Sequence, residues 1–126
     1  VVSSLIGKFQ DKEAIVIYLP DHGETIYDDG GNLAGHVDEN PNHQQLEIPM
    51  IFWASPAYKA HHPEKWQAIC AAVNQPYMTD DMIHTIMDLL DIRTAEFNPA
   101  KSVINPLFDR SRKRMIHGRN YDTEMK

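Results

Sequence analysis

The spacing of hydrophobic residues changes along the chain and predicts alternating helices and strands. Residues 1–11 carry apolar side chains at helical spacing and predict the end of a helix. Residues 14–19 form an unbroken apolar run rich in β-branched side chains, which predicts a buried parallel strand. Residues 48–54 predict a second strand, since a proline near a strand's start needs no ladder donor.

Two further helices are predicted after the second strand. Residues 63–73 begin with a proline, which is favoured at an early helical position, and place apolar residues on one face. Residues 82–90 follow Thr-Asp-Asp at 79–81, which favours an N-cap and places negative charge at the positive end of the helix. Strands followed by helices in this order indicate a layered α/β fold.

Composition supports one folded domain and argues against a nucleic-acid partner. The chain has 126 residues, of which 42% are hydrophobic and 24% are charged, as is ordinary for a globular domain. Twelve basic residues against 18 acidic ones give a formal net charge of −6, whereas a nucleic-acid surface normally has a basic excess. We therefore expect residues 1–126 to form one partial domain, with residues 110–126 as a charged, solvated tail.

Other sequence features suggest that this is a piece of a longer protein. The chain opens directly into an amphipathic pattern, and Val1 is not an initiator methionine.

Cys70 is the only cysteine, which excludes an internal disulfide. No apolar run approaches the roughly 18 residues that a transmembrane helix requires.

Polar residues follow the first predicted strand, where open α/β sheets bind their ligands. Asp21 and His22 offer a carboxylate and an imidazole, two ligand types that suit Zn²⁺. Adjacent residues of a strand point to opposite faces, so the chain must turn, and Gly23 would permit this through a positive φ. His36 follows fourteen positions after His22 (36 − 22), and a loop of this length can return it to the strand end. A surface turn without a metal is the alternative.

Four segments, in order, resemble bacterial phosphoethanolamine transferases of the alkaline phosphatase and sulfatase superfamily. Residues 18–24 (YLPDHGE) are similar to a family strand that ends in Ser-Asp-His-Gly-Glu, and residues 35–36 occupy the place of a following histidine. Residues 48–53 (IPMIFW) resemble the family's Ile/Val-Pro-apolar-apolar-Trp strand. Residues 79–92 resemble its Asp-Asn-apolar-apolar-His-Thr helix, and the likeness covers roughly residues 1–110.

The resemblance implies the C-terminal part of an alkaline phosphatase-like three-layer α/β domain, with zinc as the cofactor. It implies that Asp21 and His22 are zinc ligands and that His36 is a catalytic residue contacting the phosphoryl group or a second zinc. Zinc would activate the nucleophile and stabilise charge on the phosphoryl oxygens. Glu24 and His43 are further substrate-binding candidates, although Glu24 could instead orient His22 or be a turn carboxylate.

The implied reaction moves phosphoethanolamine from phosphatidylethanolamine to lipopolysaccharide or another envelope glycan. The implied parent is anchored in the bacterial inner membrane, with this domain in the periplasm. Its threonine nucleophile and a further acidic zinc ligand are expected before the first residue, so this piece is expected to be inactive alone. Pro20 stands where the family usually has serine. The intervening loop is closer to members acting on core heptose or glucans, because it carries the acidic residues Asp28, Asp29, Asp38 and Glu39.

Two other functions stay open on the sequence. A sulfatase or phosphodiesterase of the same superfamily would hydrolyse its substrate, and a sulfatase would need an upstream Cys or Ser for formylglycine and usually calcium. A non-catalytic domain that binds envelope glycans is the third candidate. For that domain, His22→Ala would leave ligand binding untouched.

Overall fold

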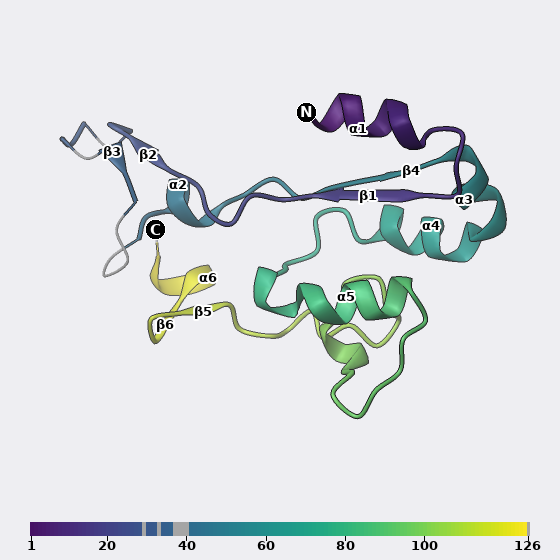
Figure 1. The fold of residues 1–126 in the computed structure, drawn as a ribbon. Helices are drawn as coiled ribbons and strands as arrows, with labels where there is room; N and C mark the ends of the chain where they lie inside the picture. Colours follow the sequence, from purple (N-terminus) through teal and green to yellow (C-terminus); the bar gives the residue numbers. More distant parts are fainter. Residues whose placement is uncertain (29, 33, 37–40, 126) are drawn as a thin grey trace.

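Figure 1 shows the protein in a computed structural model, which describes residues 1–28, 30–32, 34–36 and 41–125. Its helices are α1 (Val2–Phe9), α2 (His43–Leu46), α3 (Pro56–His61), α4 (Pro63–Ala71), α5 (Met82–Leu89) and α6 (Tyr121–Glu124), with 3₁₀ turns η1 (Thr79–Asp81) and η2 (Pro99–Lys101). Its strands are β1 (Ile15–Tyr18), β2 (Thr25–Ile26), β3 (Ala34–Gly35), β4 (Ile51–Ala54), β5 (Met115–Ile116) and β6 (Arg119–Asn120).

The two longest strands form an antiparallel pair. Ile15 lies opposite Ala54, and Tyr18 lies opposite Ile51. The prediction of a parallel strand at residues 14–19 is therefore wrong in direction. The predicted burial is also wrong at Tyr18, whose exposed fraction is 40%. An apolar run indicates that both faces of a strand have apolar neighbours, but it carries no information on the direction of the partner strand.

The hydrophobic core lies between this strand pair, α4, α5 and the segment after η2. Its buried members are Ile69, Leu89, Val103, Ile104 and Phe108. Side chains from both strands, including Ile17 and Phe52, pack against this cluster. The two helices predicted at residues 63–73 and 82–90 are confirmed as α4 and α5, and Figure 1 draws both on the same side of the strand pair.

Ser55 joins the end of β4 to the start of β1 and begins a helix that the sequence analysis missed. Its side chain is fully buried, and its Oγ accepts hydrogen bonds from the backbone N–H groups of Ala14 and Tyr58, each at 3.1 Å. The Ser55 N–H in turn donates to the Ala14 carbonyl at 2.9 Å. Ser55 is thus the N-cap of α3, and Pro56 takes the first helical position, where its missing N–H costs nothing.

The start of α5 is held by an ion-pair cluster instead of a side-chain cap. Asp81 is 1% exposed and makes no capping hydrogen bond. Its carboxylate oxygens lie 3.1 Å from Lys101 Nζ and 2.5 Å from Arg112 Nη1. Arg112 also pairs with Asp80 at 2.8 Å, so two carboxylates of η1 hold one guanidinium from the C-terminal segment.

The C-terminal segment, residues 114–125, folds back onto the rest of the chain. The β5–β6 hairpin leads into α6, and Met125 is buried. Arg114 pairs with Asp122, and its guanidinium stacks 4.4 Å from the ring centre of Tyr121. The sequence analysis expected residues 110–126 to form a charged, solvated tail; within that range most of the described residues are exposed or half-buried, and Met125 is buried. None of the helices in the described part of the chain has the length and hydropathy to cross a bilayer.

Ser55→Ala is expected to lower the free energy of unfolding by about 2 kcal/mol, because the helix cap is lost and the Ala14 N–H is left without its buried acceptor. Urea unfolding followed by circular dichroism measures the effect. Ser3→Ala, the same substitution on the exposed surface of α1, is the matched control and should change stability by less than about 0.5 kcal/mol. Equal effects of the two substitutions would contradict the role of Ser55.

Candidate metal centre

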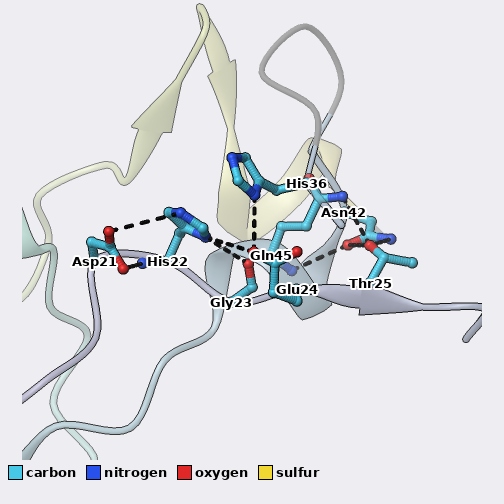
Figure 2. Close-up of polar contacts among 8 residues, drawn as sticks. All are labelled: Asp21, His22, Gly23, Glu24, Thr25, His36, Asn42 and Gln45. Atoms are coloured by element: carbon cyan, nitrogen blue, oxygen red, sulfur yellow. Dashed lines mark hydrogen bonds and ion pairs between the residues drawn. The ribbon is translucent and has the colours of Figure 1, made fainter. Parts of the chain in front are cut away.

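A short hairpin brings His36 back to the end of β1. Thr25 of β2 lies opposite Gly35 of β3, so the next residues outward, Glu24 and His36, face one another. The ring centres of His22 and His36 are 4.0 Å apart. The expectation that the loop returns His36 to the end of the first strand is confirmed (Figure 2).

Three side chains of metal-ligating type meet at this hairpin. His36 Nδ1 lies 2.9 Å from Glu24 Oε1, and His22 Nδ1 lies 3.5 Å from the same oxygen. Each of the three residues offers one ligand atom, and these atoms lie within 4.8 Å of one another. All three side chains are exposed, so the group is open to ions and substrates in the solvent.

Asp21 lies on the other side of His22 and stands outside this group of three. Its side chain is 89% exposed, and Oδ2 lies 3.8 Å from His22 Nε2. The His22 backbone N–H donates to Oδ1 at 3.1 Å, and this hydrogen bond holds the pKa of Asp21 below its usual value. The sequence expected Asp21, His22 and His36 at this strand end, and the structure shows that Glu24 lies beside His36, on the opposite side of the His22 imidazole from Asp21.

The backbone fixes which nitrogen of His22 faces Asp21. His22 Nδ1 lies 2.9 Å from the Gly23 carbonyl oxygen, which can only accept a hydrogen bond. Nδ1 therefore carries the proton, and in the neutral ring the lone pair resides on Nε2. A backbone carbonyl that holds one ring nitrogen in this way is a common support for a metal-ligating histidine. The lone pair of His22 Nε2 and the Asp21 carboxylate can therefore contact the same cation.

Gly23 is required for a reason other than the predicted one. It does not have a positive φ, so the turn does not use the left-handed region. Instead, its backbone packs against α2, where the Gly23 N–H donates to the Gln45 carbonyl at 2.8 Å. A Cβ at this position would lie 2.0 Å from the Gln44 carbonyl oxygen. Only glycine allows the turn and α2 to approach this closely.

A buried polar cluster supports the base of the hairpin. Thr25 Oγ1 accepts from Asn42 Nδ2 and from Gln45 Nε2, both at 2.8 Å. Asn42 Oδ1 caps α2 by accepting from the Gln45 N–H at 3.1 Å. Both Thr25 and Gln45 are almost fully buried. The sequence analysis did not single out this cluster, although asparagine followed three positions later by glutamine is a helix-start signal.

His43 is engaged on both ring nitrogens. Nε2 lies 2.5 Å from the Met125 carbonyl oxygen, and Nδ1 lies 3.1 Å from both Glu47 Oε1 and the Tyr121 hydroxyl. The hydrogen bonds to Glu47 and to the Met125 carbonyl raise the pKa of His43 above 6.5. The sequence made His43 a substrate-binding candidate, and these contacts add a positioning role in which it ties α2 to the C-terminal segment.

A cleft of about 520 Å³ opens beside the turn that carries Asp21 and His22. Its walls come from the turn, from the end of α2, from the segment before η1 and from the C-terminal segment; among its lining residues are Asp21, His22, Glu47, Tyr77, Arg114 and Tyr121. The sequence analysis missed Glu47, Arg114 and Tyr121 as site residues. Glu47 and Tyr121 are 74 positions apart, and no local pattern connects them.

The acidic loop before α2 is described only in part. Asp28 Oδ2 accepts a hydrogen bond from the Ile26 N–H at 2.7 Å, which shapes the hairpin. Asp29, Asp38 and Glu39, which the sequence analysis grouped with Asp28, lie outside the described residues.

The fold and the candidate site agree with a family assignment. The sulfatase family model matches residues 1–92, and the chain belongs to this family. Its fold is the α/β fold of alkaline phosphatase-like domains, as the sequence predicted.

Particular relatives make the comparison more specific. The chain is 33% identical over 111 residues to phosphoethanolamine transferase EptC of Escherichia coli O18:K1:H7 (strain RS218), and the match covers 86% of this chain and 19% of that protein. It is 28% identical over 102 residues to phosphoethanolamine transferase CptA of Salmonella typhimurium, covering 80% of this chain and 17% of that protein. The chain thus spans less than a fifth of the length of these curated relatives.

Solved structures give the same result. The crystal structure of the C-terminal periplasmic domain of EcEptC from Escherichia coli matches with a TM-score of 0.82 and 30% identity, over 98% of this chain and 37% of that one. A structure of the same domain in complex with zinc matches equally well, with a TM-score of 0.82 over 98% of this chain and 36% of that one.

Gly23→Ala is expected to lower the free energy of unfolding by about 2 kcal/mol, because its Cβ would clash with the backbone of α2. Gly7→Ala is the matched control: a Cβ there meets nothing within 4 Å, and the change should stabilise α1 by about 0.5–1 kcal/mol. Denaturant unfolding of both variants tests the contrast. A neutral Gly23→Ala would show that the close approach to α2 is dispensable.

His43 is expected to titrate with a pKa above 6.5, because both ring nitrogens face acceptors when the ring is protonated. A raised folded-state pKa means that the stabilisation is complete below pH 6.5 and is lost as the pH rises through the folded-state value. NMR titration of the ring gives this pKa, and unfolding of wild type and His43→Gln at several pH values gives the stability. A pKa at or below 6.5, or a stability difference that grows at high pH, would be inconsistent with this network.

Proposed function

We propose that this chain is part of a zinc-dependent transferase that moves phosphoethanolamine from a phosphatidylethanolamine donor to an envelope glycan such as lipopolysaccharide. The observation that carries the proposal is the meeting of His22, Glu24 and His36 beside Asp21 at the end of β1. This arrangement occurs in a sulfatase-family chain whose curated relatives include the phosphoethanolamine transferases EptC and CptA.

The donor set fits zinc better than calcium or magnesium. Zinc is bound by imidazole nitrogens and carboxylate oxygens, whereas calcium and magnesium take mainly oxygen ligands. Here the Asp21 carboxylate and the His22 imidazole lie side by side in one turn, with Oδ2 3.8 Å from Nε2. We assign Asp21 and His22 Nε2 as zinc ligands, because the Gly23 carbonyl holds the proton of His22 on Nδ1. When bound, zinc would lower the pKa of an attacking hydroxyl and stabilise negative charge on the phosphoryl oxygens.

Glu24 and His36 supply a second function at the same place. The Glu24 carboxylate accepts from His36 Nδ1 at 2.9 Å, which orients the ring and leaves Nε2 to face a substrate. A carboxylate that holds a histidine in one tautomer is the usual support for proton transfer. We therefore assign to His36 a hydrogen bond or proton transfer to the phosphoryl group, and to Glu24 the positioning of His36.

The expected setting follows from the proposed substrates. Phosphatidylethanolamine is a membrane lipid, so the proposed enzyme works at the bacterial inner membrane with this domain in the periplasm. The matched solved structure is likewise of a C-terminal periplasmic domain.

Zinc content and transfer activity test the proposal in the full-length protein that carries this segment. Asp21→Ala and His22→Ala should each lose zinc and lower the rate of phosphoethanolamine transfer from phosphatidylethanolamine by more than about 100-fold, because even supporting residues of metal sites contribute 10–100-fold. His61→Ala, an exposed histidine that pairs with Glu13 away from this site, is the matched control and should keep both properties.

Three outcomes would count against the proposal. If the wild-type protein holds no zinc under zinc-replete conditions, the assignment of zinc fails. If His22→Ala keeps full activity, the assignment of His22 as a zinc ligand fails. Release of phosphoethanolamine to water, with no glycan acceptor used, would favour a hydrolase of the same family.

A further inference from the structure

The cleft beside the candidate metal centre is lined by a carboxylate, that of Glu47, to which the proposed reaction assigns no role. Glu47 lines this cleft together with Asp21 and His22. It stands just beyond α2, the helix whose Gln45 carbonyl accepts from the Gly23 N–H at 2.8 Å. Because Glu47 follows Gln45 by only two positions, this backbone contact brings Glu47 into the same cleft as the turn.

The Glu47 carboxylate is held in place and kept ionised. Oε1 accepts from His43 Nδ1 at 3.1 Å and from the Tyr121 hydroxyl. The Tyr121 hydroxyl, followed by His43, holds the pKa of Glu47 below its usual value. Both hydrogen bonds go to Oε1, and no hydrogen bond to Oε2 is found among the described residues. One oxygen of a fixed carboxylate thus remains to receive a donor from the cleft.

The Glu47 side of the cleft can receive a positively charged group. Its charged lining consists of the carboxylates of Asp21 and Glu47 and the guanidinium of Arg114. Arg114 already pairs with Asp122 and stacks on Tyr121, so its charge is matched outside the cleft. With Asp21 assigned to zinc, the Glu47 carboxylate is the acidic group of this lining that is left to meet a positively charged donor, and Oε1 holds its contact with His43 while Oε2 faces the donor.

Phosphoethanolamine carries such a group only two carbons from its phosphate. If the phosphoryl group lies at Asp21 and His22, as the proposed function requires, the ammonium group must lie within a few ångströms in the same cleft. We propose that Glu47 binds the ammonium group of phosphoethanolamine, with Tyr121 and His43 as the residues that position its carboxylate. This inference rests on the proposed function and adds the residue that distinguishes an ethanolamine headgroup from an uncharged one.

Two small probes separate the ammonium contact from the phosphate contact. O-phosphorylethanolamine and ethyl phosphate share the same phosphate and the same two-carbon chain, and only the first ends in an ammonium group. Isothermal titration of each probe into the zinc-loaded full-length protein gives two affinities. Wild type should prefer O-phosphorylethanolamine by about tenfold, the effect of one charge-assisted hydrogen bond in a partly exposed cleft.

Glu47→Gln should abolish this preference and leave the affinity for ethyl phosphate unchanged, which also shows that the variant is folded. Glu64→Gln, at an exposed position in the first turn of α4, is the matched control and should keep the preference. Equal wild-type affinities for the two probes, or a preference that survives in Glu47→Gln, would overturn the role of Glu47 while the proposed transferase stands. If neither probe binds to the wild type, the proposed function and this inference fall together.

Discussion

The candidate site depends on one close backbone contact, between Gly23 and α2. The Gly23 N–H donates to the Gln45 carbonyl at 2.8 Å, and no side chain larger than hydrogen fits between them. From this contact the Gln45 side chain reaches Thr25 and secures the hairpin that carries His36. The same contact aligns the end of α2 with the cleft. The absence of a Cβ at Gly23 therefore sets the position of the His36 hairpin relative to the end of α2.

Local patterns in the sequence predicted the features that depend on neighbouring residues. The first strand follows from an unbroken apolar run, α4 and α5 follow from hydrophobic period, and the return of His36 agrees with the length of its loop. The direction of the strand pair and the packing of the C-terminal segment were not predictable in this way. The pairing of Glu47 with Tyr121 joins residues 74 positions apart, and hydrophobic period specifies a face of an element but not its partner.

Paired carboxylates and histidines recur across the structure and serve different ends. At the turn and hairpin, Asp21 accompanies His22, and Glu24 accompanies His36. His43 and Glu47 form a similar pair that closes the C-terminal segment over the cleft. The pairs differ in the contact of the second ring nitrogen. Within the described part of the chain, this nitrogen contacts a backbone carbonyl in His43 but not in His36. That difference separates a histidine that holds the fold from one that can meet a ligand.

The antiparallel pairing of β1 with β4 has a consequence for the segment that connects the two strands. Tyr18 lies opposite Ile51, so the chain leaves the strand pair and returns to it at adjacent positions. The residues assigned to the metal, to the phosphoryl group and to the ammonium group all lie in the segment between β1 and β4. The strand register is set on either side of it and does not depend on its length. A change within this segment can therefore alter the contacts to a substrate while the strand register stays constant, provided that Tyr121 still reaches Glu47 from the C-terminal segment.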